Sequence, residues 1–256
     1  MKKKFGQNFL INNDVVNRII NATNIDKNSQ ILEVGPGNGS LTKEIIKKNP
    51  KKFIAIEIDK SLKKNISDLF IKKNYNLLFQ DALTFDENKN FSSNYTVISN
   101  LPYNISLTLL LKWIGKLNDK YSANRMVLMF QKEVGERILA NLNSKKYGRI
   151  TILCSAFFSI NKICDVDKNN FFPIPKVDST VLAFERLNKF KISFKNLDRL
   201  DKISYIFFNN RRKKLKKKIE NYFSDSQIHN NNLKKLYDLR VENLSKDFFY
   251  NLVENL

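Results

Sequence analysis

Histidine, cysteine and tryptophan are scarce in this chain of 256 residues. Its one histidine, His229, lies in a polar segment rich in asparagine, and without a second histidine most histidine-based catalysis is excluded. Cys154 and Cys164 form no close pair and no cluster with histidine, which argues against a disulfide scaffold and against a zinc site. We therefore expect no metal, and reduced cysteines in a cytoplasmic protein.

Long apolar runs are also missing. The chain starts with Met1 and three lysines and continues in a polar mixture, so no segment has the length of a membrane span or of the apolar part of a signal sequence. This favours a cytoplasmic protein that does not contact a membrane. A chain of this length can bury a full core, as one large domain or as one large and one small domain.

Acidic residues are in the minority, with 25 Asp and Glu against 45 Lys and Arg, which gives a net charge of +20. Such a charge is typical of a protein that binds a polyanion. Lysines account for 36 of the 45 cations, and asparagine and isoleucine are abundant as well. That bias is typical of an AT-rich genome, so the charge supports nucleic-acid binding without establishing it.

Short apolar runs alternate with segments of helical spacing over the first 187 residues. The predicted strands are 31–34, 53–57, 77–79, 96–99, 125–130, 160–166 and 179–184. The predicted helices between them are 15–20, 41–46, 60–70, 107–114, 132–139 and 148–158. This alternation predicts an α/β fold with a seven-stranded, mainly parallel sheet that is covered by helices on both faces.

From about residue 188 the pattern changes to helices without strands, so we expect two domains, 1–187 and 188–256. Residues 211–218 hold seven cations in eight positions and are flanked by apolar residues. We expect this run, together with the lysines at positions 2–4, to contact phosphates, although a solvated surface of biased composition would look the same.

A glycine-rich stretch follows the first predicted strand, with Gly35, Gly37 and Gly39 at alternate positions. Glycines there allow a tight turn and let the backbone approach a ligand closely. Glu57 ends the next strand, where a carboxylate can accept the hydroxyls of a ribose. The pattern fits either NAD or S-adenosylmethionine, and the absence of a Walker lysine disfavours a nucleoside triphosphatase of that type.

The stretch Asn100-Leu101-Pro102-Tyr103 follows the fourth predicted strand. Pro102 disfavours helical geometry at Leu101, which gives the Leu101 carbonyl a defined direction. Asn100 adds a side-chain oxygen that accepts hydrogen bonds and is no base near neutral pH. Two acceptors beside the Tyr103 ring suit a planar group that carries an amine, such as an adenine lifted out of its stack. Because ligands bind such sheets at the carboxyl ends of the strands, we expect this stretch and the glycine-rich stretch to meet there.

The whole set of motifs resembles the KsgA/RsmA family of rRNA adenine dimethyltransferases, from the N-terminus into the C-terminal region. The resemblance is carried by residues 5–10 (FGQNFL), 33–42 (EVGPGNGSLT), 57–59 (EID), 80–85 (QDALTF), 100–106 (NLPYNIS), 131–133 (QKE), 147–149 (YGR), 173–179 (PIPKVDS) and 211–213 (RRK). The usual run of three prolines reads Pro173-Ile174-Pro175 here, a departure that leaves the loop extended.

This resemblance implies a class I methyltransferase sheet whose last strand is antiparallel, followed by a small helical domain, and we expect a monomer. It implies S-adenosylmethionine as the cofactor and two adjacent adenines in a hairpin near the 3′ end of small-subunit rRNA as the substrate. The implied cofactor contacts are Asn8, Leu10, Gly35, Gly37, Glu57, Asp81 and Asn100. The implied substrate contacts are Tyr103, Phe171, Arg211, Arg212 and Lys213.

Three other functions remain open from the sequence. An adenine methyltransferase of large-subunit rRNA, of the antibiotic-resistance type, shares the glycine-rich stretch and a motif like residues 100–103. A ribosome-assembly or transcription factor could use the same fold without catalysis. An NAD-dependent oxidoreductase is disfavoured, because the glycine spacing differs and the predicted rim offers no proton donor.

Overall fold

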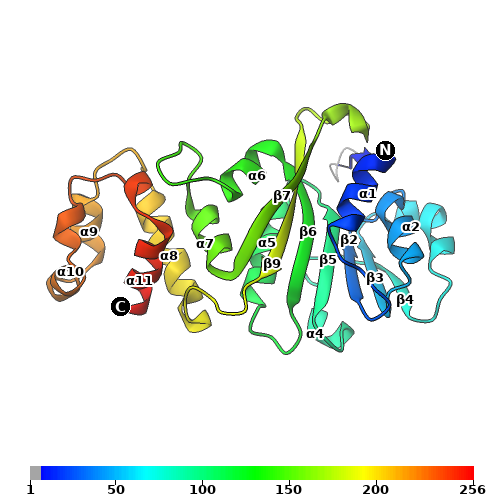
Figure 1. The fold of residues 1–256 in the computed structure, drawn as a ribbon, viewed down its shortest axis with the longest axis horizontal. Coiled ribbons are helices and arrows are strands. Elements are labelled where there is room, and N and C mark those ends of the chain that lie inside the picture. The colour runs from blue at the N-terminus through cyan, green and yellow to red at the C-terminus, as the bar shows by residue number, and fades with distance from the viewer. Residues whose placement is uncertain (1–6) are drawn as a thin grey trace. The chain divides into compact units, whose positions relative to one another are not determined.

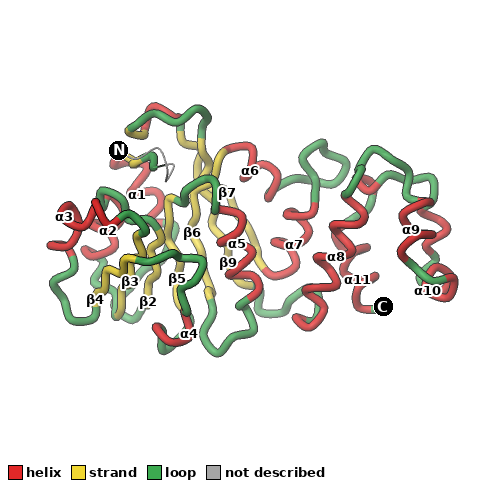
Figure 2. The backbone as a smooth tube through the Cα atoms, turned by 180° about the vertical axis from the view of Figure 1, so that it is seen from behind, coloured by secondary structure: helices red, strands yellow, loops and turns green. Residues whose placement is uncertain are grey.

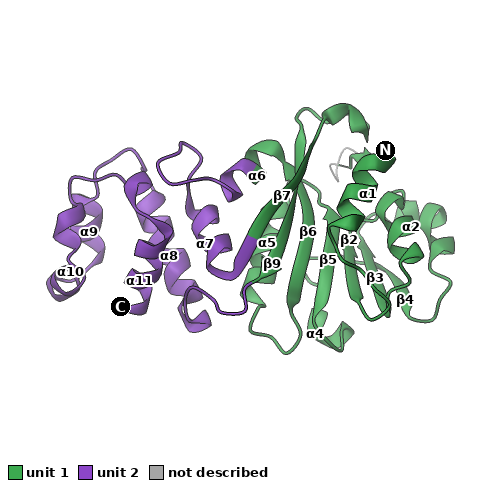
Figure 3. Cartoon of the chain, viewed as in Figure 1, with its two compact units in different colours: residues 1–135, 160–186 green, residues 136–159, 187–256 purple. Residues whose placement is uncertain are grey.

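The computed structural model describes residues 7–256, so the lysines at 2–4 lie outside the described residues. The chain divides into two compact units (Figure 3). Unit 1 holds the residues up to 135 together with 160–186, and unit 2 holds 136–159 together with 187–256. The predicted domains differ from these units in the segment 136–159, which the sequence boundary assigns to the first domain.

Unit 1 is built on a seven-stranded sheet with the strand order β4-β3-β2-β5-β6-β9-β7 (Figure 1). Strands β2 to β6 pair in parallel, and β9 runs antiparallel to β6. The predicted fold class is thereby confirmed, including the antiparallel last strand. The strands are β2 (Gln30–Val34), β3 (Lys52–Glu57), β4 (Tyr75–Phe79), β5 (Tyr95–Asn100), β6 (Ala123–Gln131), β7 (Phe158–Val166) and β9 (Ser179–Arg186).

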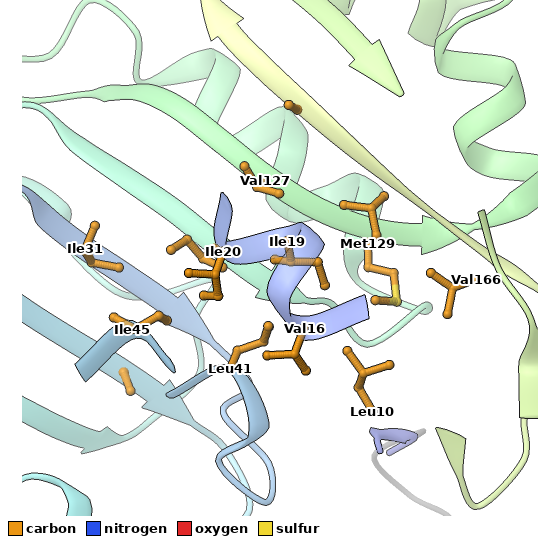
Figure 4. Close-up of a cluster of buried hydrophobic side chains, with 14 of the residues drawn as sticks. Leu10, Val16, Ile19, Ile20, Ile31, Leu41, Ile45, Val127, Met129 and Val166 are labelled. Carbon is orange, nitrogen blue, oxygen red and sulfur yellow. The ribbon is translucent and has the colours of Figure 1, made fainter. Parts of the chain in front are cut away.

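The central strands are rich in apolar residues, and most of their residues are buried on one face of the sheet or the other. Alternate residues point to opposite faces, so Ile31, Val127 and Met129 meet helix α1 on one face (Figure 4). Helix α5 covers the other face, as the views from the two sides show (Figures 1 and 2). A sheet covered on both faces holds its strand ends rigidly, which matters for any site built on them.

Some helical segments of unit 1 begin at a side-chain cap. Asn12 accepts hydrogen bonds from the backbone N–H groups of Asp14 and Val15 at the start of α1, and Asp59 accepts from Ser61 after β3. The predicted helix over 60–70 is a short α-helix between two 3-10 turns. The helices are α1 (Asn13–Asn21), α2 (Ser40–Lys47), α3 (Lys63–Ile66), α4 (Glu87–Asn90), α5 (Ser106–Gly115) and α6 (Lys132–Ile138), which continues past residue 135 into unit 2.

A second, two-stranded sheet pairs β1 (Phe9–Leu10) with β8 (Phe171–Phe172). The sequence did not predict it, because both strands are only two residues long. Directly opposite residues in an antiparallel pair share a face. Leu10 and Phe171 lie together in the hydrophobic core, whereas Phe9 and Phe172 share the other face.

Unit 2 is helical, apart from the first two residues of β7, and its described helices pack through aromatic side chains. Phe207 and Phe249 meet edge to face with ring centroids 5.6 Å apart, and the Tyr147 hydroxyl donates to the Leu244 carbonyl at 3.0 Å. The helices are α7 (Arg149–Phe157), α8 (Leu197–Phe208), α9 (Lys216–Tyr222), α10 (Asp225–Asn230) and α11 (Lys246–Glu254). No helix within residues 7–256 has the length and apolar character needed to cross a membrane.

Candidate functional site

Two loops meet at the carboxyl edge of the parallel sheet. The glycine-rich stretch leaves β2 and the stretch from Asn100 to Tyr103 leaves the neighbouring strand β5, so both emerge at one edge. A Cβ placed on Gly35 would lie 3.8 Å from the Pro102 ring. These loops enclose a pocket lined by Gln7, Asn8, Phe9, Leu10, Glu33, Gly35, Pro36, Gly37, Asn38, Ser40, Leu41, Glu57, Ile58, Asn100, Leu101, Pro102 and Tyr103.

The glycine-rich stretch uses conformations that side chains disfavour. Gly35, Gly37 and Gly39 have φ of 71°, 57° and 82°. A Cβ on Gly37 would lie 2.8 Å from the Phe9 ring, so Gly37 is required by crowding as well as by its backbone conformation. The loop is held to the neighbouring strand by the Gly35 N–H, which donates to the Ile56 carbonyl at 2.8 Å.

Glu57 ends β3 with its side chain almost fully buried at the pocket. Its carboxylate accepts hydrogen bonds from the backbone N–H groups of Asp59 at 2.9 Å and Gly37 at 3.3 Å. Burial raises the pKa of this carboxyl, while the N–H donors act in the opposite direction. The arrangement fixes a carboxylate beside the glycine-rich stretch, where it can accept hydrogen bonds from the hydroxyls of a ligand.

Glu33 is a second buried carboxyl at this pocket, and the sequence analysis gave it no role. It lies in β2, is 1 % exposed, and accepts a hydrogen bond from the Thr42 hydroxyl at 2.7 Å. Burial raises the pKa of Glu33 from 4.5 to about 8; the Thr42 bond opposes this shift, and the nearby charge of Glu57 adds to it. The Glu33 carboxyl is therefore neutral over most of the physiological pH range. In this form it packs behind the glycine-rich stretch as a buried, hydrogen-bonded side chain.

The raised pKa of Glu33 predicts a pH dependence of stability. A carboxyl whose pKa is higher in the folded state stabilises the fold most below its unfolded value of 4.5, and that stability is lost as pH rises towards 8. We expect Glu33→Gln to reduce the fall in the free energy of unfolding between pH 5.5 and 8.5 by a few kcal/mol. Urea unfolding of both proteins at several pH values measures this, and parallel pH profiles would contradict it.

Asn100 is oriented by the segment that precedes β1. Its side-chain N–H donates to the Asn8 carbonyl at 2.9 Å, which fixes the amide and leaves Oδ1 as its acceptor. Asn8 and Leu10 were expected at the cofactor only by resemblance, and the structure places both of them in the lining of the pocket. Their position follows from long-range hydrogen bonds that no local pattern reveals.

The segment before α1 is fastened across the pocket at two further points. The Gln7 amide donates to the Asp59 carboxylate at 3.0 Å, and the Ser40 hydroxyl donates to the Leu10 carbonyl at 2.7 Å. Sequence reasoning missed Gln7 and Ser40 as site residues, although both lie inside the motifs that carry the resemblance. The pocket is thus closed on one side by a chain segment remote in sequence.

Tyr103 is held at the pocket by its hydroxyl, which shares a hydrogen bond of 2.7 Å with the Ser179 hydroxyl at the start of β9. Burial raises the pKa of Tyr103, so the phenol stays neutral. The side chain of Leu101 is buried, while Pro102 and Tyr103 remain half-buried at the lining. The site therefore has an amide oxygen, a turn locked by proline and a tethered aromatic ring, all within one loop.

Asp81 is not among the residues that line this pocket. It follows β4, which pairs with β3 so that Phe79 lies opposite Glu57. One oxygen of Asp81 accepts a hydrogen bond from the Leu83 N–H at 2.8 Å and thereby shapes the turn after β4. The side chain is half-buried. Its role at a cofactor stays a prediction.

Phe171 does not present a free face to a ligand in this structure. Its side chain is 1 % exposed and packs in the core cluster with Leu10 and Val166. Its pairing with Leu10 turns it inward in this structure, and its expected role in covering a base stays a prediction. The neighbouring Phe172 is 62 % exposed and shares a face with Phe9 of the pocket lining.

The basic run lies in unit 2, and its members differ in role. Arg211 forms an ion pair of 2.7 Å with Glu242 and donates to the carbonyls of Lys145 and Ser144, so its charge is used inside the unit. Arg212 and Lys213 are exposed. Lysines surround a hollow lined by Ile206, Asn209, Asn210, Lys213, Lys214, Lys216, Lys217, Lys218, Asn221 and Tyr222.

The chain is similar to known proteins over its whole length. The family model described as ribosomal RNA adenine dimethylase matches residues 1–256. A protein of Pelagibacter ubique named ribosomal RNA small subunit methyltransferase A is 39% identical over 254 residues, which cover 99% of this chain and 95% of that protein.

Solved structures show the same likeness in three dimensions. A dimethyladenosine transferase from Plasmodium falciparum matches with a TM-score of 0.82 at 27% identity, covering 96% of each chain. The 23S rRNA methyltransferase ErmE matches with a TM-score of 0.70 at 20% identity, covering 97% of this chain and 99% of that one. The second likeness is one of fold alone.

Proposed function

This chain belongs to the ribosomal RNA adenine dimethylase family, and from that premise we propose that it dimethylates two adjacent adenines in the 3′-terminal hairpin of small-subunit rRNA. It is an rRNA adenine methyltransferase that uses S-adenosylmethionine. The small-subunit assignment is supported by the name of the full-length relative at 39% identity. The main structural support for this site is one pocket that is lined by the Asn100 amide, the glycine-rich stretch and Glu57. The Asn100 amide is held there by its hydrogen bond to the Asn8 carbonyl.

The residues present fit S-adenosylmethionine. Gly35 and Gly37 line the pocket without side chains of their own, so a ligand can approach their backbone closely. Glu57 would accept the ribose hydroxyls, Asp81 the adenine amine, and Asn100 would lie near the methionine end. S-adenosylmethionine supplies a methyl group on a positively charged sulfur, which is open to attack by a nitrogen lone pair.

The work left to this chain is to hold the target adenine. The lone pair of an adenine amine is delocalised into the ring, so the amine is a poor nucleophile. Oδ1 of Asn100 and the carbonyl of Leu101 accept its two N–H groups, reduce the delocalisation of the lone pair into the ring and orient it towards the methyl group. Positioning of this kind supplies the main catalytic effect, and no general base is needed beforehand because the nitrogen becomes acidic only as the new bond forms.

Tyr103 adds a stacking surface for the extruded base. Stacking on an aromatic ring contributes about 1–3 kcal/mol, which is comparable with the few kcal/mol that extrusion costs. The hydrogen bond between the Tyr103 and Ser179 hydroxyls keeps the ring in place before the substrate arrives. An amide at position 100 also suits a second methylation, when the amine retains one N–H to be held.

The alternative functions are less well supported. The likeness to the 23S rRNA methyltransferase is at 20% identity and concerns the fold, whereas the small-subunit relative is 39% identical. A factor without catalysis would not need Asn100 and Glu57 kept in the pocket. An NAD-dependent oxidoreductase is disfavoured by the family to which the chain belongs and by its glycine spacing.

The proposed function is tested with purified ribosomal subunits from cells that lack adenine dimethylation. Each subunit is incubated with the protein and labelled S-adenosylmethionine, and the modified adenines are located by mass spectrometry of the rRNA. We expect dimethyladenine at two adjacent positions of the small subunit and none in the large subunit. Methylation of the large subunit alone would favour the resistance-type enzyme, and no methylation of either would favour a factor without catalysis.

The lysine-lined hollow of unit 2 is our candidate for phosphate contact. Lys213 and Lys217 line it and are exposed, and Arg212, next to Lys213 in the chain, is exposed as well, whereas Arg211 is held by Glu242. If these three side chains neutralise phosphates and release the counterions that those phosphates hold, changing all three to Gln should reduce the slope of log affinity against log salt by roughly two to three. Filter binding of rRNA at several salt concentrations measures the slope.

A matched control variant removes three positive charges from a different part of the surface. Lys27, Lys48 and Lys51 are exposed and lie before β2 and β3, at the edge of the sheet opposite the pocket. Their triple change to Gln lowers the net charge equally and should leave the salt slope nearly unchanged. Equal slopes for the two triple variants would contradict the assignment of the hollow and favour a general effect of charge.

A further inference from the structure

A buried charge cluster lies where α4 meets α5 in unit 1. Glu87 is 1 % exposed, and its two carboxylate oxygens pair with Lys112 at 2.9 Å and Lys116 at 2.7 Å. The Trp113 indole N–H donates to the same carboxylate at 3.3 Å. A buried carboxylate with this many partners is fully compensated, so the cluster is a rigid element.

Lys112 does more than neutralise Glu87. Its ammonium group also donates to the carbonyls of Ala82 and Phe85, each at 2.7 Å. With the bond to Glu87, all three of its donors are used, and two of them hold the loop that follows β4. Lys116 makes no such bond to this loop among the interactions of the described residues.

The loop held by Lys112 carries Asp81. Asp81 immediately precedes Ala82, and the Asp81 carboxylate is close enough to favour the charged form of Lys112. Burial nevertheless lowers the pKa of the Lys112 ammonium, as expected for a cation withdrawn from water. The Asp81 backbone and the turn that it caps are therefore fastened to α5, an element packed in the core.

We propose that Lys112 is a positioning residue for the adenine end of the cofactor site, because it fixes the loop that presents the Asp81 carboxylate. This inference rests on the proposed function, in which Asp81 accepts a hydrogen bond from the amine of the cofactor adenine. Lys112 itself does not line the pocket. Its effect is thus on selectivity for the adenine amine, and the methyl-transfer step is unaffected.

The test compares two ligands that differ only in that amine. Affinities are measured by calorimetry for S-adenosylhomocysteine and for its analogue with an unsubstituted purine. We expect Lys112→Met to weaken binding of S-adenosylhomocysteine about tenfold, the size of a lost hydrogen bond to a charged group, and to leave the analogue nearly unchanged. Lys116→Met is the matched control, since it removes the other partner of Glu87, and should change neither affinity.

A double variant separates positioning from general damage. Asp81→Asn should lower the ratio of the affinity for S-adenosylhomocysteine to the affinity for the purine analogue. Adding Lys112→Met to Asp81→Asn should lower this ratio no further. An equal loss for both ligands in Lys112→Met, or additive losses in the double variant, would overturn the proposal. If the wild-type protein itself failed to bind S-adenosylhomocysteine, the proposed function would fail first, so the two failures are distinguishable.

Discussion

Replacing Asn100 with alanine should lower the rate of adenine methylation about 100-fold or more, while binding of rRNA persists. In the proposed mechanism the amide supplies one of the two acceptors that orient the target amine, and misplacement of a reacting group by about 1 Å can cost about that factor. Because the hydrogen bond from Asn100 to the Asn8 carbonyl is also lost, the segment before β1 loosens as well. Single-turnover methylation at saturating cofactor measures the effect on the chemical step.

Two further variants make this result specific. Asn104 lies four residues on and is exposed, so Asn104→Ala makes the same chemical change on the same loop and should leave turnover close to normal. Asn100→Asp keeps the shape but cannot donate to the Asn8 carbonyl, so we expect it to be nearly inactive as well. Near-normal turnover of Asn100→Ala would refute the proposed role of the amide.

Replacing Gly37 with alanine should weaken binding of S-adenosylmethionine about tenfold or more. A φ of 57° costs a side-chain-bearing residue about 1–2 kcal/mol, and the new Cβ would lie 2.8 Å from the Phe9 ring. Either the loop or the ring must move, and both line the pocket. Calorimetric titration with S-adenosylhomocysteine measures the loss, and a companion melting curve shows how much of the strain falls on the fold.

Comparison with Gly35 separates the effect of the backbone conformation from the effect of crowding against Phe9. Gly35 has a similar φ of 71°, but its Cβ would meet only ordinary contacts at 3.8 Å. We therefore expect Gly35→Ala to weaken binding less than Gly37→Ala. Changing Phe9 to alanine in the Gly37→Ala background removes the crowding and should give a smaller total loss than the sum of the two single changes. Fully additive losses would show that crowding against Phe9 is unimportant.

Much of unit 1 was predictable because its strands are short apolar runs whose pattern is local. Each predicted strand of the seven-stranded sheet is present, and two helical segments begin at local caps, Asn12 and Asp59. The pair β1 and β8 was missed, since two-residue strands carry no periodicity and are formed by pairing across the chain. Helix α4 was missed for a similar reason, being a single turn set by its Asp86 cap.

The candidate site was only partly predictable. Gly35 follows a strand and Glu57 and Asn100 end strands, and parallel strands bring their carboxyl ends to one edge whatever the details of packing. The burial of Phe171 and the use of Arg211 within unit 2 could not be foreseen, because both depend on partners far away in sequence. The same holds for Lys112, which in the sequence is one lysine among 36.

The sequence by itself determined the strand and helix alternation, the family, and the residue types that we propose as acceptors for the adenine amine and the ribose hydroxyls. These depend on local spacing and on short motifs, which are properties of neighbouring residues. Only the tertiary structure decided which side of the Asn100 amide is tethered, which aromatic at residues 171–172 is exposed, and which lysine holds the loop of Asp81. Those outcomes depend on contacts between remote segments, and such contacts form only when the core of unit 1 fixes the distances between them.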